Sequence, residues 1–189
     1  MISFFRFTHR FKRSLLEITS DSQYVYYWNP DPLSKERLPD NIVFEIATGK
    51  KAYDIIRRYE DCGHFFSQKV IDILSQFVDM SDKCYPIKIK GLDEQYYVIY
   101  NLEAYPYWNR DEDTFMHDPR YFGMQAPSTP IFGIEGTLFI MVSEDVKNAL
   151  LKNKVSNIEL VESFGCSLEE YKKLKKSKVK PEVHVYRDK

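Results

Sequence analysis

Two stretches of the sequence each place a pair of strand-like runs on either side of a glycine turn, and this pattern most limits the possible folds. Residues 85–90 and 95–102 are rich in apolar and aromatic side chains and meet around Gly91. Residues 131–134 and 137–142 flank Glu135-Gly136, a pair that favours the positive φ of a tight hairpin turn. Hairpins join antiparallel neighbours, so the sequence predicts an antiparallel sheet.

Helices are predicted from apolar spacing and from capping residues. Ser67 precedes apolar residues at helical spacing, and we expect its hydroxyl to accept a hydrogen bond from the first turn. Ser143 precedes two carboxylates at the start of a second helix, and Ser167 opens an S-x-x-E capping box for a third helix over residues 168–178. A further helix is predicted from four residues that share one helical face: Ala52, Tyr53, Ile56 and Tyr59.

Hairpins and helices follow one another without a regular βαβ rhythm, so we predict an α+β fold with a mainly antiparallel sheet and helices packed on it. Further strands are expected over residues 23–28, 42–46 and 157–161. The N-terminus is interpreted as an ordinary strand or helix with a solvated basic face. The alternative is an arginine-rich amphipathic helix with its apolar residues on one side: Phe4, Phe7, Phe11 and Leu15.

Length and composition predict one soluble domain over residues 1–189, with a lysine-rich tail from about residue 172 to residue 189. The net charge of −1 provides no global field to recruit nucleic acid, and the apolar runs are too short to span a membrane. The 3 cysteines form no CxxC pair, which argues against a disulfide framework and a zinc site. We therefore expect a cytoplasmic protein with no cofactor, no metal and no secretory signal.

The most distinctive segment is the aromatic and acidic stretch at residues 105–120. One interpretation is a protein-binding surface, because tyrosine and tryptophan dominate interface hot spots and negative charge steers a basic partner. The residues assigned to that surface are Tyr105, Tyr107, Trp108, Asp111, Glu112, Asp113 and Phe115. The alternative is a small hydrolase or metal-dependent enzyme that uses Asp111, Asp113, His117 and Asp118, although their spacing matches no known metal cage. A solvated acidic loop with its aromatics against the sheet is the third interpretation.

Two other patterns favour structural roles. Cys62 and His64 suggest a nucleophile and base, but such pairs normally come from distant parts of a fold, so we expect Gly63 to end a helix while Cys62 packs. The tail from Lys172 to Lys180 carries many lysines but few aromatic residues, which favours a solvated helix end over a nucleic-acid site. Deleting the chain from Lys175 onward should leave the fold intact unless an alternating edge strand docks there: Val183, Val185 and Tyr186.

Three segments resemble bacterial polymorphic-toxin immunity proteins. These segments are residues 65–74, the strand pair around residues 96–103, and residues 131–163, where an apolar strand ends in Val-Ser-Glu before an amphipathic helix and a last strand. The sequence is similar to the immunity-protein families numbered eleven and forty-three over about residues 42–163. The resemblance implies a cytoplasmic protein without enzymatic activity that binds and neutralises a cognate protein toxin. The acidic segment at residues 105–120 does not match the pattern of those families.

Overall fold

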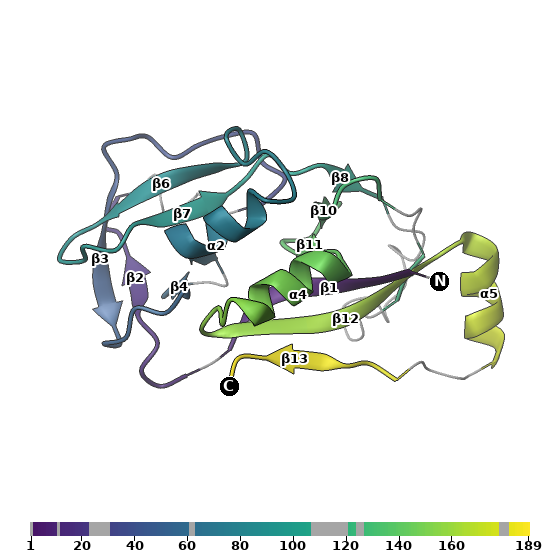
Figure 1. Ribbon diagram of the computed structural model, residues 1–189. Helices are drawn as coiled ribbons and strands as arrows, with labels where there is room; N and C mark the ends of the chain where they lie inside the picture. The colour runs from purple at the N-terminus through teal and green to yellow at the C-terminus, as the bar shows by residue number, and fades with distance from the viewer. Residues whose placement is uncertain are drawn as a thin grey trace.

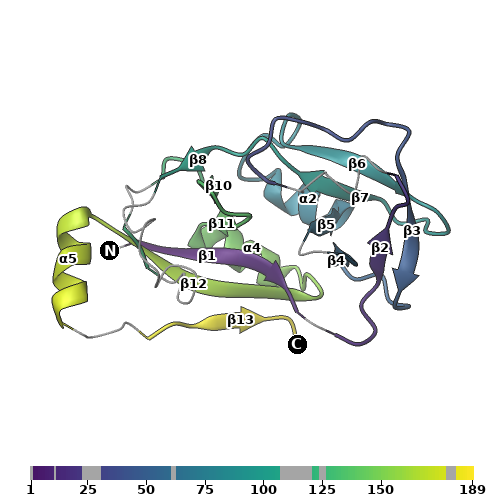
Figure 2. The same ribbon diagram turned by 180° about the vertical axis from the view of Figure 1, so that it is seen from behind.

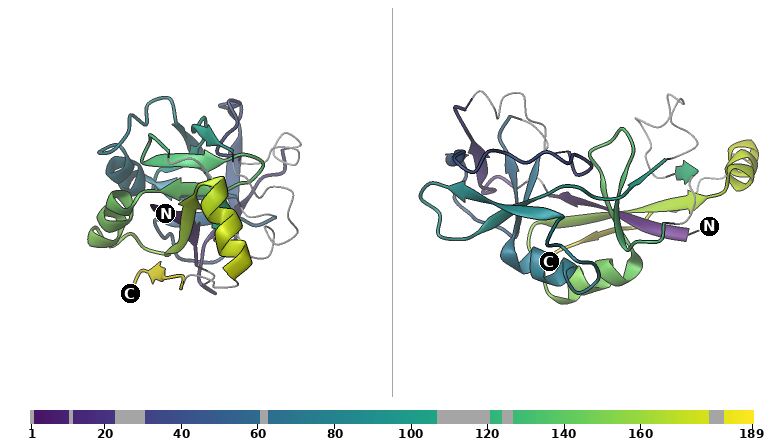
Figure 3. Two further views of the ribbon diagram at one scale, coloured as in Figure 1. Left: turned by 90° about the vertical axis from the view of Figure 1, so that its right-hand side faces the viewer. Right: turned by 90° about the horizontal axis from the view of Figure 1, so that it is seen from above.

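The strands form an open sheet and a closed barrel that lie side by side (Figure 1). The computed structural model describes residues 2–10, 12–22, 31–60, 63–106, 121–123, 127–177 and 182–189. The barrel lies at one end of the molecule, and helix α5 (Leu168–Ser177) lies at the other end (Figure 3). The described chain is thus mainly β with some helices, which confirms the predicted fold class in part.

The sheet has the strand order β13-β12-β1-β11-β10-β8, and β9 pairs with β12 beside β13. Its long central pair is β1 against β12, whose antiparallel register runs from Ile2 opposite Gly165 to His9 opposite Ile158. The β8–β10 and β9–β12 pairs are parallel, and the others are antiparallel. The strands are β1 (Ile2–His9), β8 (Ala104–Tyr105), β9 (Tyr121–Gly123), β10 (Ile131–Ile134), β11 (Ile140–Val142), β12 (Ile158–Cys166) and β13 (Val185–Arg187).

Six strands of the described chain close into a barrel in the order β2-β3-β6-β7-β5-β4. The β2–β4 and β3–β6 pairs are parallel, so the barrel is mixed rather than antiparallel. The sequence did not predict this closure, because no local pattern reports which distant strands pair. The strands are β2 (Glu17–Thr19), β3 (Val43–Thr48), β4 (Ile55–Arg58), β5 (His64–Ser67), β6 (Cys84–Ile89) and β7 (Tyr96–Ile99).

Both predicted hairpins are present. Strand β6 pairs antiparallel with β7, and β10 pairs antiparallel with β11. Gly91 and Gly136 have φ of 80° and 70°, the left-handed region that glycine enters without a steric penalty. A side chain at either position would strain the turn. The local sequence was therefore sufficient to specify these two turns.

Helices α2 (Gln68–Leu74) and α4 (Glu144–Lys152) join the two units. Helix α2 packs on β5 and β7 of the barrel, α4 packs on β1 of the sheet, and the two helices contact each other (Figure 1). Their inner faces share one apolar cluster with Phe7 of β1, Phe66 of β5 and Val142 of β11. The sheet and the barrel are thus held together by a continuous core rather than by a linker.

The predicted caps of α4 and α5 are confirmed, but the cap of α2 differs. The Ser143 hydroxyl accepts a hydrogen bond from the Val146 N–H, and the Ser167 hydroxyl accepts one from the Glu170 N–H. Ser67 precedes α2 as predicted, yet its hydroxyl makes no cap bond and donates instead to Asp54 at 2.9 Å. The prediction for the Ser67 side chain was wrong, because the fold places the Asp54 carboxylate within reach and the side chain is oriented to donate to this charged acceptor.

The helix predicted from Ala52, Tyr53, Ile56 and Tyr59 is absent, and strand β4 takes its place. Ile55 and Ile56 are both fully buried, the first in the core shared with the helices and the second inside the barrel. A strand buried on both faces needs consecutive apolar residues, and that pattern also fits one face of a helix. Gly63 therefore ends no helix but lies in the connection from β4 to β5.

The N-terminal segment is a central strand of the sheet rather than an amphipathic helix. Phe5 and Phe7 face the core beneath α4, while Phe4 faces the opposite side of the sheet with Phe132 and Met141. Seen from behind, β1 runs from the sheet toward the barrel, and its last residues approach β4 and β5 (Figure 2). The predicted strand at residues 157–161 extends to Cys166, and the one at residues 23–28 lies outside the described residues.

Candidate functional site

Tyr105 is the first residue of the predicted recognition segment, and the structure fixes its side chain at an edge of the sheet. It ends β8, where its ring packs edge-on against Phe132 at 5.3 Å between centroids. The Tyr105 hydroxyl donates to Glu103 Oε1 at 2.6 Å and accepts the Ser128 N–H at 3.1 Å. These bonds hold the start of the segment against the residues that lead into β10.

The other six predicted recognition residues lie outside the described residues: Tyr107, Trp108, Asp111, Glu112, Asp113 and Phe115. The same is true of His117 and Asp118, which the enzyme hypothesis requires. The described ends of this segment are well separated in the sheet. Before the segment, the chain lies in β8, the strand at one edge of the sheet. After the segment, the chain continues in β9, which pairs with β12 toward the opposite edge.

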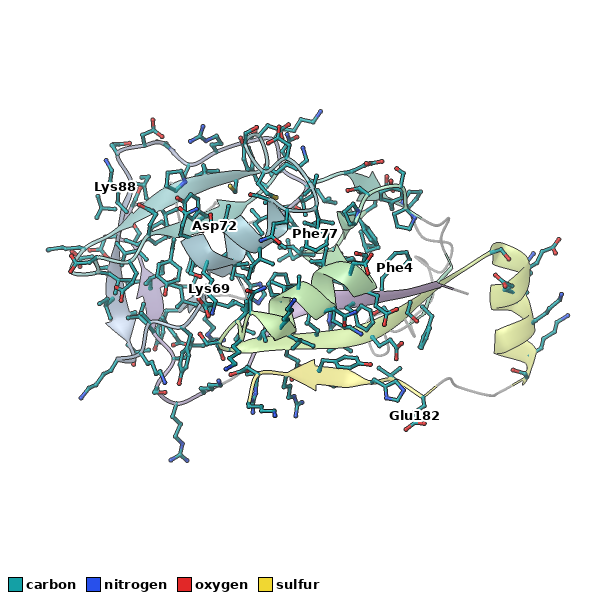
Figure 4. The ribbon with its side chains drawn as sticks, in the orientation of Figure 1. Phe4, Lys69, Asp72, Phe77, Lys88 and Glu182 are labelled. Atoms are coloured by element: carbon teal, nitrogen blue, oxygen red, sulfur yellow. The ribbon has the colours of Figure 1, made fainter. Side chains whose placement is uncertain are left out.

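A carboxylate at the junction between barrel and sheet binds both units. Asp54 precedes β4, and its Oδ2 accepts the Ser156 N–H at 2.7 Å and the Ser156 hydroxyl at 2.8 Å. Its Oδ1 accepts the Ser67 hydroxyl, and Lys69 Nζ lies 3.2 Å from Oδ2. Lys69 reaches from the start of α2 toward the turn before β12, where it also donates to the Lys154 carbonyl at 3.0 Å (Figure 4).

The pKa of Asp54 lies below its usual value. Burial alone would raise the pKa of this carboxyl, but the hydrogen bonds from Ser156, Ser67 and Lys69 stabilise the charged form and outweigh it. Asp54 is therefore ionised at neutral pH and stabilises the junction. We call these four residues, Asp54, Ser67, Lys69 and Ser156, the Asp54 cluster.

A second polar group at the junction contains two histidines. The strand register places Glu17 of β2 beside Arg57 of β4, and Arg57 beside His64 of β5. Glu17 forms an ion pair with Arg57, and His9 at the end of β1 meets His64 with 2.7 Å between Nδ1 and Nε2. We call His9, Glu17, Arg57 and His64 the histidine cluster.

Both imidazoles of this cluster are hard to protonate. Burial, followed by the positive charge of Arg57, lowers the pKa of His9 to about 4. Burial, followed by His9 and Arg57, lowers the pKa of His64 to about 3. Both rings are therefore neutral at neutral pH, when one nitrogen of the contact donates a hydrogen and the other accepts it.

His64 thus contacts His9, which lies on a strand distant in the sequence. Cys62, the other half of the suggested nucleophile and base, lies outside the described residues. Sequence reasoning singled out His64 but missed His9, Glu17, Arg57 and Asp54. The contact between His9 and His64 joins residues 55 positions apart, so no local spacing could have indicated it.

Comparison with protein-family models finds no match, and comparison with curated proteins finds none either. Within the described ranges, no group of three or more His, Cys, Asp or Glu residues is arranged to hold a metal ion. No helix among the described residues is both long enough and apolar enough to cross a membrane.

Proposed function

We propose that this chain is an immunity protein that acts in the cytoplasm and neutralises a cognate bacterial toxin by direct protein–protein contact. The proposal rests on the resemblance of residues 42–163 to polymorphic-toxin immunity proteins and on the aromatic and acidic segment that starts at Tyr105. No catalytic residue and no cofactor are part of it.

The observation that carries the proposal is the fixed position of Tyr105. Its hydroxyl and its ring are both held by neighbours in the sheet, and they anchor the start of a segment rich in tyrosine, tryptophan and carboxylates. An interface residue that is ordered before binding loses little entropy when the partner arrives. A rigid base therefore favours recognition through this segment.

Within the segment, aromatic and acidic residues have separate roles. Tyr107 and Trp108 act as anchors, because large aromatic side chains contribute most to interface hot spots. Asp111, Glu112 and Asp113 attract a basic surface of the toxin and accelerate association. A standard interface buries roughly 1,600 Å² in total, so surfaces of neighbouring strands complete the site.

The test is a pull-down with the purified protein to find its partner, followed by binding kinetics with that partner. Trp108→Ala should weaken binding by about 2 kcal/mol or more, mainly through faster dissociation, while the variant keeps its circular dichroism spectrum. Neutralising Asp111, Glu112 and Asp113 together should slow association and reduce its salt dependence. Tyr59→Ala is the matched control, because Tyr59 is 57% exposed and follows β4 of the barrel, whereas Tyr105 lies at an edge of the sheet.

Two outcomes contradict the proposal. Wild-type affinity in a folded Trp108→Ala variant places recognition elsewhere, and loss of folding in that variant makes Trp108 a core residue.

The enzyme hypothesis has its own test, calorimetry with Mg²⁺, Ca²⁺, Mn²⁺ and Zn²⁺. We expect no stoichiometric micromolar binding; a site abolished by Asp113→Ala or His117→Ala would support the metal-dependent enzyme instead.

A further inference from the structure

The contact between His9 and His64 lies where the end of β1 meets the barrel. The ring centroids are 4.8 Å apart, and Thr8 Oγ1 lies 3.4 Å from His64 Nε2. His9 is only 6% exposed. At 2.7 Å the two ring nitrogens are close enough for one hydrogen between them, so one nitrogen must remain an acceptor.

Protonation of both rings destroys this arrangement. A fully protonated imidazole carries hydrogen on both nitrogens, so two imidazolium rings would direct two N–H donors and two positive charges at each other. A single added proton keeps the hydrogen bond but places a charge in a buried site. The contact thus tolerates at most one extra proton.

The charged groups around the pair oppose protonation on balance. Arg57 on β4 disfavours a positive charge on either ring. Glu17 on β2 and Glu159 on β12 favour a charge on His9, but Glu17 is already paired with Arg57, and Glu159 with Arg187 of β13. Asp188, near the C-terminus, forms ion pairs with Arg10 and Lys12, which follow β1. The nearby carboxylates are therefore engaged with other cations.

We propose that His9 and His64 form a proton-sensitive contact between sheet and barrel, which must stay neutral in the folded chain and therefore makes the fold less stable as pH falls below about 6.5. The contact borders the core that both units share, since the rings of Phe7, two residues before His9, and Phe66, two residues after His64, meet at 5.3 Å between centroids. Disruption of the contact is therefore transmitted to the whole fold rather than confined to a surface loop. This inference does not depend on the proposed toxin binding.

The direction of the pH effect follows from proton linkage. In the unfolded chain both histidines have a pKa of about 6.5, whereas in the folded chain the pKa values are about 4 and about 3. Between these values the unfolded state binds protons that the folded state does not, so acid favours unfolding. The folding equilibrium constant should fall up to tenfold per pH unit for each histidine.

The experiment is denaturant unfolding of the full chain at pH 7.5 and pH 5.5. For the wild type we expect the equilibrium constant to fall about 100-fold between these values, because few carboxylates titrate there. The double variant His9→Asn/His64→Gln replaces each bonding nitrogen with a non-titrating amide at a similar position, and its constant should fall less than about tenfold. His184→Gln is the matched control and should keep the wild-type pH dependence, because His184 is exposed.

A second measurement keeps the proposal testable if the double variant does not fold. Nitrogen NMR of the imidazole rings in the wild type should show His9 and His64 neutral at pH 5.5 and joined by one hydrogen bond. Titration of both rings with midpoints near 6.5 would overturn the proposal. A pH dependence in the double variant equal to that of the wild type would overturn it as well.

Discussion

The barrel and the sheet bury their apolar residues in different ways. The barrel closes on itself and encloses one cluster that includes Ile18, Phe44, Phe65 and Tyr96. The sheet stays open, with β8 at one edge and both β9 and β13 along the outer side of β12. Closure removes unpaired strand edges, whereas an open sheet leaves edges from which long connections can leave and return.

This difference suggests a division of roles. The barrel core also contains tyrosines whose hydroxyls are bonded within the fold: Tyr96 donates to the Tyr53 carbonyl at 2.6 Å, and Tyr85 accepts the Leu38 N–H. Burial raises the pKa of Tyr85 to about 12, so the phenol stays neutral at neutral pH. On the proposed function, the barrel takes no direct part in recognition, and the segment proposed for recognition leaves from the sheet.

The largest effect is expected inside the barrel. Phe65→Ala should lower the free energy of unfolding by about 3–5 kcal/mol, because Phe65 is fully buried and packs against the ring of Phe44 at 5.4 Å. Urea denaturation measures the loss. If the barrel takes no direct part in recognition, toxin affinity should be unchanged under conditions where the variant is folded. A specific loss of binding would contradict this division of roles.

The next effect concerns the edge strand β13. Deleting residues 182–189 removes the pairing with β12 and the Tyr186 ring, which lies 4.3 Å from Nζ of the buried Lys147. It also removes the Asp188 carboxylate that pairs with Lys12. We expect a loss of about 2 kcal/mol or more, seen as a fall in melting temperature of about 5 °C or more.

The control for that deletion is a double substitution of exposed lysines on α5, Lys172→Gln/Lys173→Gln. It should leave the melting temperature within about 2 °C of the wild type, since exposed charges contribute little. The predicted lysine-rich tail therefore has two parts: a solvated helix face and a strand that belongs to the sheet. Equal melting temperatures for the deletion variant and the wild type would show that β13 does not contribute to the stability of the fold.

A smaller effect is expected at the junction between the two units. Asp54→Asn keeps the shape of the side chain but removes the charge that accepts bonds from Ser67, Lys69 and Ser156, at a cost of about 1–3 kcal/mol at pH 7. The difference from wild type should shrink as acid protonates Asp54, because a lowered pKa stabilises the fold only while the carboxyl is ionised. Thermal unfolding at pH 7 and pH 3 measures both.

Asp72→Asn provides the comparison for this variant. Asp72 lies on the exposed face of α2, where its carboxylate accepts a bond from Gln68 one turn earlier (Figure 4). We expect a change within about 0.5 kcal/mol at either pH, because an exposed pair contributes little. Equal effects of Asp54→Asn and Asp72→Asn would show that the Asp54 cluster does not hold the barrel to the sheet.

Local sequence features determined the hairpin turns and the starts of two helices. The hairpin turns at Gly91 and Gly136 and the capped starts of α4 and α5 were predicted, because turn and cap residues act on neighbours within a few positions. The edge strand at Val185–Arg187 was anticipated from its alternation. Of the predicted recognition residues, Tyr105 alone is described, at the end of β8, and its role in recognition stays a prediction.

Only the tertiary structure decided the rest. Ile55 and Ile56 became a strand because neighbours on both faces bury them, and Ser67 turned to Asp54 because the fold places a carboxylate within its reach. The same holds for His9 and His64, whose shared hydrogen bond joins residues 55 positions apart. Strand closure and buried polar contacts arise from long-range packing, and the free energy of such packing is not encoded in the spacing of any short segment.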